Sequence, residues 1–237
     1  MISTETALFA FLGGILPAMI WLYFLLKEDS RCPEPRSMIV LALMAGMLSV
    51  PLVLPMERFA ILALPAGIPV ILAWAAIEET VKYALAALVV LWRKAVNESV
   101  DYVVYMLTVA LGFAALENML FLIAPFSGGN ILEGLLTGNL RFVGSTLLHV
   151  VASSTIGFAL AFSFRKPRWV RTLFAVVGLI LAIALHALFN FLIIDGNGSS
   201  TLLAFFVVWS GAVILFAMFE LLKYLRYHRL PKNTCPS

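Results

Sequence analysis

The chain has 237 residues, of which 62% are hydrophobic and only 12% are charged. Apolar runs of about 18 residues or more recur along it, each long enough to cross about 30 Å of hydrocarbon. This composition excludes a water-soluble globular domain, and the net charge of +3 comes from short basic loops rather than from a nucleic-acid-binding surface. Lipid does not satisfy unpaired backbone groups, and the runs do not alternate in polarity, so the spans are predicted to be helices. We therefore expect an all-α, polytopic membrane protein that is embedded in the lipid bilayer and has no nucleic-acid partner.

In chain order, the apolar runs predict a bundle of about seven transmembrane helices in a single domain. Pro51 and Pro55 predict the end of the second helix, with a turn at residues 56–58, because proline interrupts the hydrogen bonding of a helix. The third run is too long for one straight span, and its prolines and glycine at residues 65–69 predict a kinked or re-entrant start. The expected helices cover about 5–26, 38–55, 59–92, 101–124, 139–164, 169–194 and 201–224, followed by a basic tail at 225–237.

The basic residues predict how the helices are oriented in the cell membrane. They gather at the connections after the first, third and fifth expected helices and in the C-terminal tail, whereas Arg58 and Arg141 are the exceptions on the opposite side. Short loops rich in Lys and Arg stay in the cytoplasm. The N-terminus is therefore predicted to lie outside and the C-terminus in the cytoplasm.

The third apolar run carries three ionisable side chains in its middle, Glu78, Glu79 and Lys82. An ionisable group at bilayer depth costs about 2.5–3.5 kcal/mol on insertion scales, so such a cluster is expected to have a purpose. On a helix, Lys82 can reach both carboxylates, because it lies four residues after Glu78 and three after Glu79. We expect Lys82 to lie nearer to Glu79 and to leave Glu78 available, while an ion-pair cluster that only locks helix packing is the structural alternative.

Further polar groups lie at a similar depth in other apolar runs. At about 1.5 Å per residue from the predicted cytoplasmic ends, Glu78 and the three other ionisable groups lie about 21 to 26 Å deep. Convergence of four ionisable groups from four helices at one level suggests a shared site in the outer half of the membrane. These polar residues are Glu117 and Asn118 in the fourth helix, His149 in the fifth, and His186 and Asn190 in the sixth.

Two carboxylates and two imidazoles at one level are suited to the activation of water. A carboxylate in apolar surroundings is a stronger base than in water, so it can take a proton from a water molecule. Imidazoles can bind a metal ion or hydrogen-bond the oxyanion that forms on a carbonyl group. The spacing differs from HExxH, so a zinc site on a single helix is not predicted. The same Glu/His chain also suits a proton- or cation-coupled transporter, which is the alternative function, and a non-enzymatic scaffold is the third.

The order of these motifs is similar to that of a known family. EETVK at 78–82, GFAALEN at 112–118, His149 in HVVASSTIG, and His186 with Asn190 in HALFN resemble the motifs of the PrsW family of intramembrane proteases. That family is related to the CAAX-processing membrane proteases. The loop DSRCPEPR at 29–36 also resembles the acidic, proline-containing loop of the family, and the resemblance covers about residues 20 to 192.

This resemblance implies an intramembrane endopeptidase that cleaves membrane-anchored proteins near the extracytoplasmic side, as in site-1 cleavage of an anti-sigma factor. Glu78 is then expected to be the general base, with Glu79 as the second choice and Lys82 setting the charge of the pair. Glu117, His149 and His186 would bind a divalent metal such as zinc or stabilise the oxyanion; a glutamate base without a metal is the alternative that stays open. Asn118 is expected to support the site, and Asn190 to orient His186.

Overall fold

The computed structural model describes residues 3–28, 32–194 and 200–227, and within them the chain is helical with no strand. Two short π-helical segments connect to the α-helices: η1 (Ala87–Leu91) extends α3, and η2 (Arg141–Ser145) joins α5 to α6. The described helices therefore form seven long rods. The all-α fold predicted from the sequence is confirmed. The α-helices are α1 (Thr4–Glu28), α2 (Arg36–Ala63), α3 (Ile68–Ala86), α4 (Ser99–Ser127), α5 (Ile131–Leu140), α6 (Thr146–Phe162), α7 (Arg168–Ile194) and α8 (Thr201–Tyr227).

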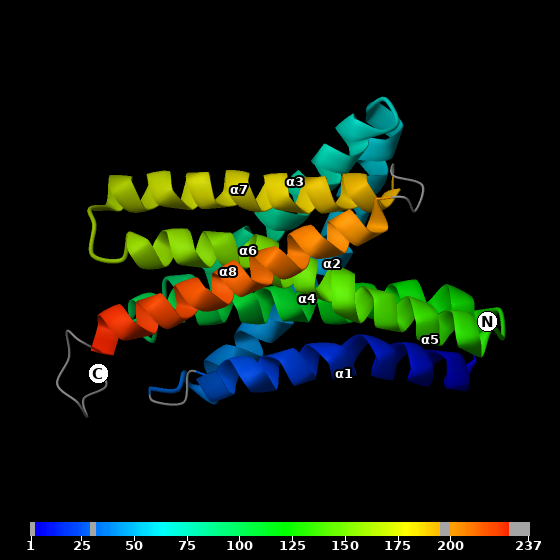
Figure 1. The fold of residues 1–237 in the computed structure, drawn as a ribbon, viewed down its shortest axis with the longest axis horizontal. Coiled ribbons are helices and arrows are strands. Elements are labelled where there is room, and N and C mark those ends of the chain that lie inside the picture. The colour runs from blue at the N-terminus through cyan, green and yellow to red at the C-terminus, as the bar shows by residue number, and fades with distance from the viewer. Residues whose placement is uncertain (1–2, 29–31, 195–199, 228–237) are drawn as a thin grey trace.

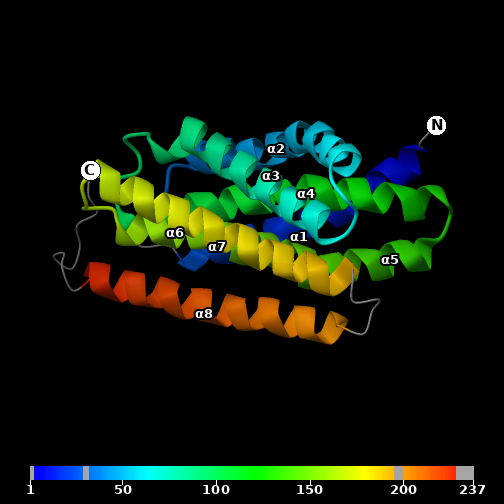
Figure 2. The same ribbon diagram turned by 90° about the horizontal axis from the view of Figure 1, so that it is seen from above.

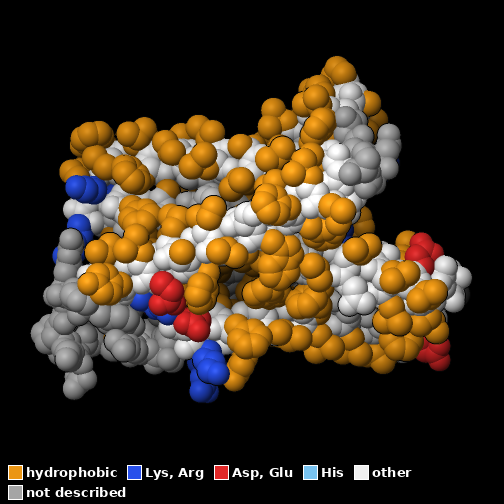
Figure 3. Space-filling view, in the orientation of Figure 1, with side chains coloured by type: hydrophobic (Ala, Val, Ile, Leu, Met, Phe, Trp, Pro, Cys, Tyr) orange, Lys and Arg blue, Asp and Glu red, His pale blue; other side chains and the backbone are white. Residues whose placement is uncertain are grey.

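The rods have the length and composition of transmembrane spans. Within the described residues, six of them are long and apolar enough to cross a membrane by these criteria. The seventh, α3 with η1, carries the three ionisable side chains of the 78–82 cluster. α1 begins at one end of the bundle and α8 ends at the other, as an odd number of spans requires (Figure 1). The visible surface between the ends is largely hydrophobic (Figure 3). The chain is therefore a multi-pass membrane protein.

The second helix is longer than the sequence predicted. α2 continues through Pro51 and Pro55 to Ala63, so residues 56–58 form no turn. Both prolines have exposed side chains on the outer face of α2, and transmembrane helices tolerate proline where neighbouring groups satisfy the freed backbone. The chain turns instead at Leu64, which is extended as expected before a proline, and at Gly67, whose φ of +92° suits glycine.

The segment between the fourth and fifth predicted helices is also more helical than expected. α4 continues through Pro125 to Ser127, and the chain then turns at Gly129, with a φ of +72°. Asn130 caps α5 by accepting a hydrogen bond from the Glu133 backbone N–H at 3.0 Å. The expected loop at 125–138 therefore becomes a helix end, a tight turn and a short helix that continues through η2 into α6. At the other end of the chain, the expected tail lies outside the described residues from 228 onward.

α4 is the central helix, and glycines bring its neighbours into direct backbone contact. A Cβ atom at Gly46 of α2 would collide with the Val109 carbonyl of α4, and one at Gly112 would collide with the Leu43 carbonyl of α2. Gly157 of α6 packs in the same way on the α4 backbone at residues 102–103. Small residues allow such close helix packing in membranes, where apolar burial gives little driving force.

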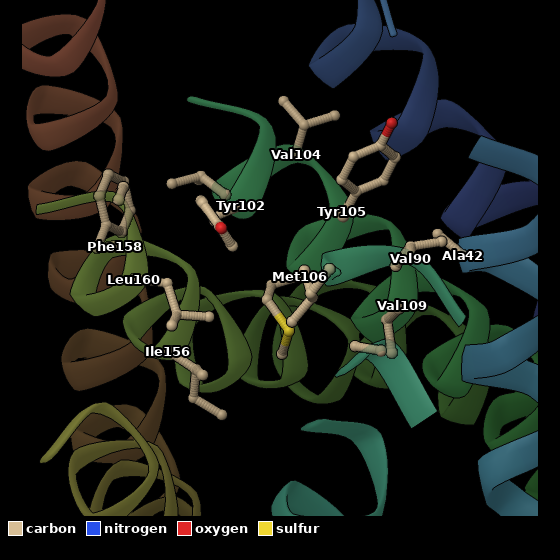
Figure 4. Close-up of a cluster of buried hydrophobic side chains, with 14 of the residues drawn as sticks. Ala42, Val90, Tyr102, Val104, Tyr105, Met106, Val109, Ile156, Phe158 and Leu160 are labelled. Atoms are coloured by element: carbon tan, nitrogen blue, oxygen red, sulfur yellow. The ribbon is translucent and has the colours of Figure 1, made fainter. Parts of the chain in front are cut away.

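The side chains of α4 complete this core. Met106 and Val109 of α4 lie among Ala42, Val90, Ile156 and Leu160 from three other rods (Figure 4). α3 runs between α2 and α7 and packs against both (Figure 2). This arrangement directs the polar faces of α3, α4, α6 and α7 toward one another.

Candidate active site

Glu79 lies at the buried centre of the polar cluster. Its side chain is fully buried, and Oε1 accepts hydrogen bonds from Lys82 Nζ at 2.6 Å and from His186 Nδ1 at 2.9 Å. Its other oxygen, Oε2, accepts a hydrogen bond from Ser153 Oγ at 2.7 Å. Glu79 thus joins α3 to α6 and α7, and both of its oxygens are engaged.

Glu78 has the opposite environment one residue earlier on α3. Its carboxylate is 3.5 Å from Lys82 Nζ, compared with 2.6 Å for Glu79, which is the order of distances that the sequence predicted. Glu78 Oε2 is buried and has no hydrogen-bond partner among the described residues. His186 Nε2 lies 3.8 Å from Glu78 Oε1, and His149 Nδ1 lies 3.9 Å from Oε2. Glu78 is therefore a buried carboxylate whose Oε2 atom forms only a long ion pair with Lys82 and accepts no hydrogen bond among the described residues.

The hydrogen bonds assign a donor nitrogen to each histidine. Because a carboxylate only accepts, His186 donates through Nδ1 to Glu79, and its Nε2 atom faces Glu78. Because an ammonium only donates, Lys82 donates to His149 Nδ1 at 3.0 Å. The His149 Nε2–H then donates to Glu117 Oε2 at 2.9 Å.

Glu117 belongs to a second polar network that η2 completes. Arg141 donates from Nη2 to Glu117 Oε2 and from Nε to Asn118 Oδ1, both at 2.6 Å. Asn118 donates in turn to Thr146 Oγ1 at 2.8 Å, and this bond ties α4 to the start of α6. The guanidinium also lies over the Phe121 ring, with 3.8 Å between its carbon and the ring centroid. Arg141 therefore holds the carboxylate that orients His149.

A cavity of about 600 Å³ connects the two networks. It extends toward the end of the bundle where α5 lies, and the exposed side chains of Leu54, Phe121 and Leu140 form part of its wall. It therefore opens on the apolar surface of the protein. Among the residues predicted from the sequence, those that line it are Glu78, Glu117, His149, His186 and Asn190.

The remaining predicted residues lie behind the cavity wall, and one assignment needs correction. Glu79, Lys82 and Asn118 do not line the cavity. Asn190 lines it, but no hydrogen bond joins Asn190 to His186 in the described part of the chain. Glu79 orients His186 instead, because α3 packs against α7 at the level of His186 and brings a stronger acceptor to Nδ1.

Two charged residues of the cavity were not predicted as part of the site. From the sequence, Arg141 was considered only as a basic residue on the outer side of the membrane, although it lies just inside the expected helix at 139–164. Glu57 was placed in a turn, whereas the continued α2 brings it to the cavity wall. For Glu57 the sequence carries no clear signal, since its position depends on a helix that passes two prolines.

Three side chains of the cluster could hold a metal ion. Glu78, His149 and His186 are buried, and one ligand atom from each lies within 4.8 Å of the other two. Two imidazoles and one carboxylate form a common ligand set for catalytic zinc, and the bond from His186 to Glu79 is the outer-shell contact that such histidines make. Glu78 Oε2, which accepts no hydrogen bond from the described residues, also fits this use. An ion bound to His149 would replace one of its two hydrogen bonds.

The structure thus groups the histidines differently from the ligand set that the sequence suggested. Glu117 was expected beside His149 and His186, but Arg141 and His149 share one of its oxygens, and Glu117 is outside the group of three. Glu78 takes its place in that group. A buried carboxylate and two imidazoles in a cavity can activate water and stabilise the charge that forms on a carbonyl group.

Comparisons with known proteins relate the chain to one family. The family profile described as PrsW family intramembrane metalloprotease matches residues 34–220. The chain is 27% identical to Protease PrsW of Clostridioides difficile (strain 630), over 84% of this chain and 85% of that protein. It is 29% identical to Protease PrsW of Geobacillus kaustophilus (strain HTA426), over 77% of this chain and 78% of that protein. No solved structure matches significantly.

Proposed function

Because the chain belongs to the PrsW family of intramembrane metalloproteases, we propose that Glu78 activates the water molecule that cleaves its substrates. The chain is an intramembrane protease, the first of the three functions that the sequence predicted. The observation that supports the role of Glu78 is its buried Oε2 atom, which accepts no hydrogen bond from the described residues and belongs to a carboxylate on the cavity wall. A general base needs such a free acceptor within reach of the water. Glu79 has no free oxygen, so it is assigned a structural role.

The neighbours of Glu78 have separate tasks in this proposal. Lys82 stays hydrogen-bonded to Glu79 and keeps the charge of the pair balanced through a longer, 3.5 Å ion pair with Glu78 Oε2. His186 presents Nε2 to the same space, because Glu79 holds its other nitrogen. His149 is held by Glu117, and Glu117 by Arg141, so that imidazole has a fixed direction.

A divalent metal such as zinc fits the same residues, and Glu78, His149 and His186 would hold it. The ion would polarise the scissile carbonyl group and make a bound water more acidic. Glu78 has two carboxylate oxygens, so one can ligate while the other accepts the proton from water. The remaining residues keep the tasks given above.

Membrane-anchored proteins are the proposed class of substrate. The cavity opens between exposed apolar side chains, so a transmembrane segment could approach it from the bilayer without leaving lipid. Cleavage near the extracytoplasmic side, as in site-1 cleavage of an anti-sigma factor, is the specific role that the family resemblance suggests. A relation to the CAAX-processing membrane proteases belongs to the same proposal.

Removal of the metal tests this function directly. With purified protein in liposomes and a single-span test substrate, a zinc chelator is expected to slow cleavage by at least about 100-fold, because Lewis-acid stabilisation is worth several kcal/mol. Added zinc should restore the rate. The metal content of His186→Ala should fall, whereas Thr137→Val, on the same cavity wall but outside the ligand group, should keep its metal. Full activity in protein shown to be metal-free would favour a glutamate base alone.

The proposed orientation can be tested with reporters in the cell membrane. A reporter fused after Lys94, or at the C-terminus, is expected to be cytoplasmic, since basic loops stay inside. A reporter inserted between Ser127 and Gly138 should be external, which would also place the cavity in the outer half of the membrane. An external C-terminus would contradict the orientation.

A further inference from the structure

A second pocket lies where α3 with η1 ends and α7 begins, and it shares no residue with the active-site cavity. Its volume is about 480 Å³. Two of its wall residues, Arg168 and Arg171, are basic, and none is acidic. Its lining residues are Tyr83, Trp92, Arg168, Arg171, Thr172 and Ala175.

Arg171 carries a positive charge that no carboxylate of the described residues neutralises through an ion pair. Its Nη2 atom donates to the Tyr102 hydroxyl, and the guanidinium carbon lies 5.3 Å from the Trp92 ring centroid. No Asp or Glu forms an ion pair with Arg171 in the described part of the chain. Its Nε atom is buried and has no hydrogen-bond partner there. A buried donor on a cation is unfavourable when left unpaired, so an acceptor is expected at this position.

The surroundings of the pocket have the character of a membrane boundary. The side chains of Trp92 and Trp169 are 59% and 71% exposed, and tryptophan is enriched where hydrocarbon meets the headgroups. Arg165 and Lys166 precede α7, and Arg93 and Lys94 follow η1, so further cations lie close in sequence to the pocket residues. Figure 3 shows basic side chains at this end of the bundle. The field here therefore favours anions.

We propose that this pocket binds the phosphate group of an anionic phospholipid headgroup. The planar guanidinium of Arg171 lines this pocket and can donate hydrogen bonds to phosphate oxygens from the N–H groups that Tyr102 leaves unused. Arg168 stands one turn before it on α7 and adds a second charge. The Thr172 hydroxyl lines the same wall, and basic pockets between transmembrane helices are known to bind such headgroups. A lipid bound here would link α7, which carries His186, to α3, which carries Glu78.

The test measures lipid retained by the full-length protein in detergent, using native mass spectrometry with phosphatidylglycerol or phosphatidylcholine. The wild type is expected to retain phosphatidylglycerol, and Arg171→Gln and Arg168→Gln should each reduce this by about tenfold, as expected for a charge-assisted hydrogen bond. Arg165→Gln is the matched control, since it removes the same charge from an exposed residue outside the pocket. It should change retention by less than about twofold.

Two further arms keep the proposal open to refutation. Arg171→Gln also loses the bond to Tyr102, so Tyr102→Phe removes that bond alone and should keep the lipid. If Arg165→Gln and Arg171→Gln lose phosphatidylglycerol equally, the lipid is attracted by the overall positive charge and not by this pocket. If the wild type retains phosphatidylcholine as well as phosphatidylglycerol, the pocket does not select an anionic headgroup. Either result would overturn the proposal. Inorganic phosphate provides the second arm. If it stabilises the protein against heating in an Arg168-dependent way while phosphatidylglycerol is not retained, the lipid source is rejected.

Discussion

Glu78→Gln is expected to fold normally and to cleave a single-span substrate at least about 100-fold more slowly, the scale on which a general base contributes. Gln keeps the shape of the side chain but cannot accept a proton from water. Glu78 Oε2 accepts no hydrogen bond from the described residues, so the change weakens only its 3.5 Å ion pair with Lys82, which keeps its 2.6 Å contact with Glu79. Cleavage rates in liposomes, measured beside thermal unfolding, check both parts of the expectation.

The control for this variant is Glu133→Gln, because Glu133 is an exposed carboxylate on α5 outside the cavity lining. It should retain activity. Metal content separates the two roles given to Glu78, since loss of a base leaves a bound ion in place and loss of a ligand releases it. Normal cleavage by a well-folded Glu78→Gln protein would reject Glu78 as the base. Poor folding would instead indicate a structural ion-pair cluster.

The sequence predicted the parts of this fold that depend on composition and spacing. Apolar runs located the spans, and the three- and four-residue spacings to Lys82 predicted which glutamate it pairs with more closely. The rise of an α-helix predicted that Glu117 and His149 lie at a similar depth, and both line one cavity. These predictions succeed because the helical rise and the thickness of hydrocarbon are nearly constant.

Other features depend on how the helices are rotated and packed against one another. Whether α2 stops at Pro55 depends on whether that proline faces the lipid, and the sequence spacing of the prolines does not reveal this. Glu57 reaches the cavity only because α2 continues past Pro55. Asn190 is one turn from His186 and was the nearest candidate to orient it by sequence. The actual partner, Glu79, lies more than a hundred residues away in the chain and reaches His186 through the packing of α3 on α7.

Glu79→Gln is expected to destabilise the protein by about 3–5 kcal/mol, the range for the loss of one partner from a buried ion pair. Lys82, His186 and Ser153 all donate to the two oxygens of Glu79. An amide has one acceptor oxygen, so its NH₂ group must face at least one of these donors, and Lys82 loses its closest counter-charge. Unfolding in denaturing detergent, followed by helical circular dichroism, measures the change.

Ser153→Ala is the graded control for Glu79→Gln, because it removes a single neutral donor from the same carboxylate. It should cost about 0.5–1.5 kcal/mol, the usual net contribution of one hydrogen bond. A large difference between the two variants would indicate that Glu79 stabilises the contact of α3 with α6 and α7 mainly through charge. A Glu79→Gln protein as stable as the wild type but inactive, beside an active Glu78→Gln protein, would reverse the assignment and make Glu79 the base. The two neighbouring carboxylates therefore predict opposite outcomes, since one has both oxygens hydrogen-bonded and the other has a buried oxygen that accepts no hydrogen bond among the described residues.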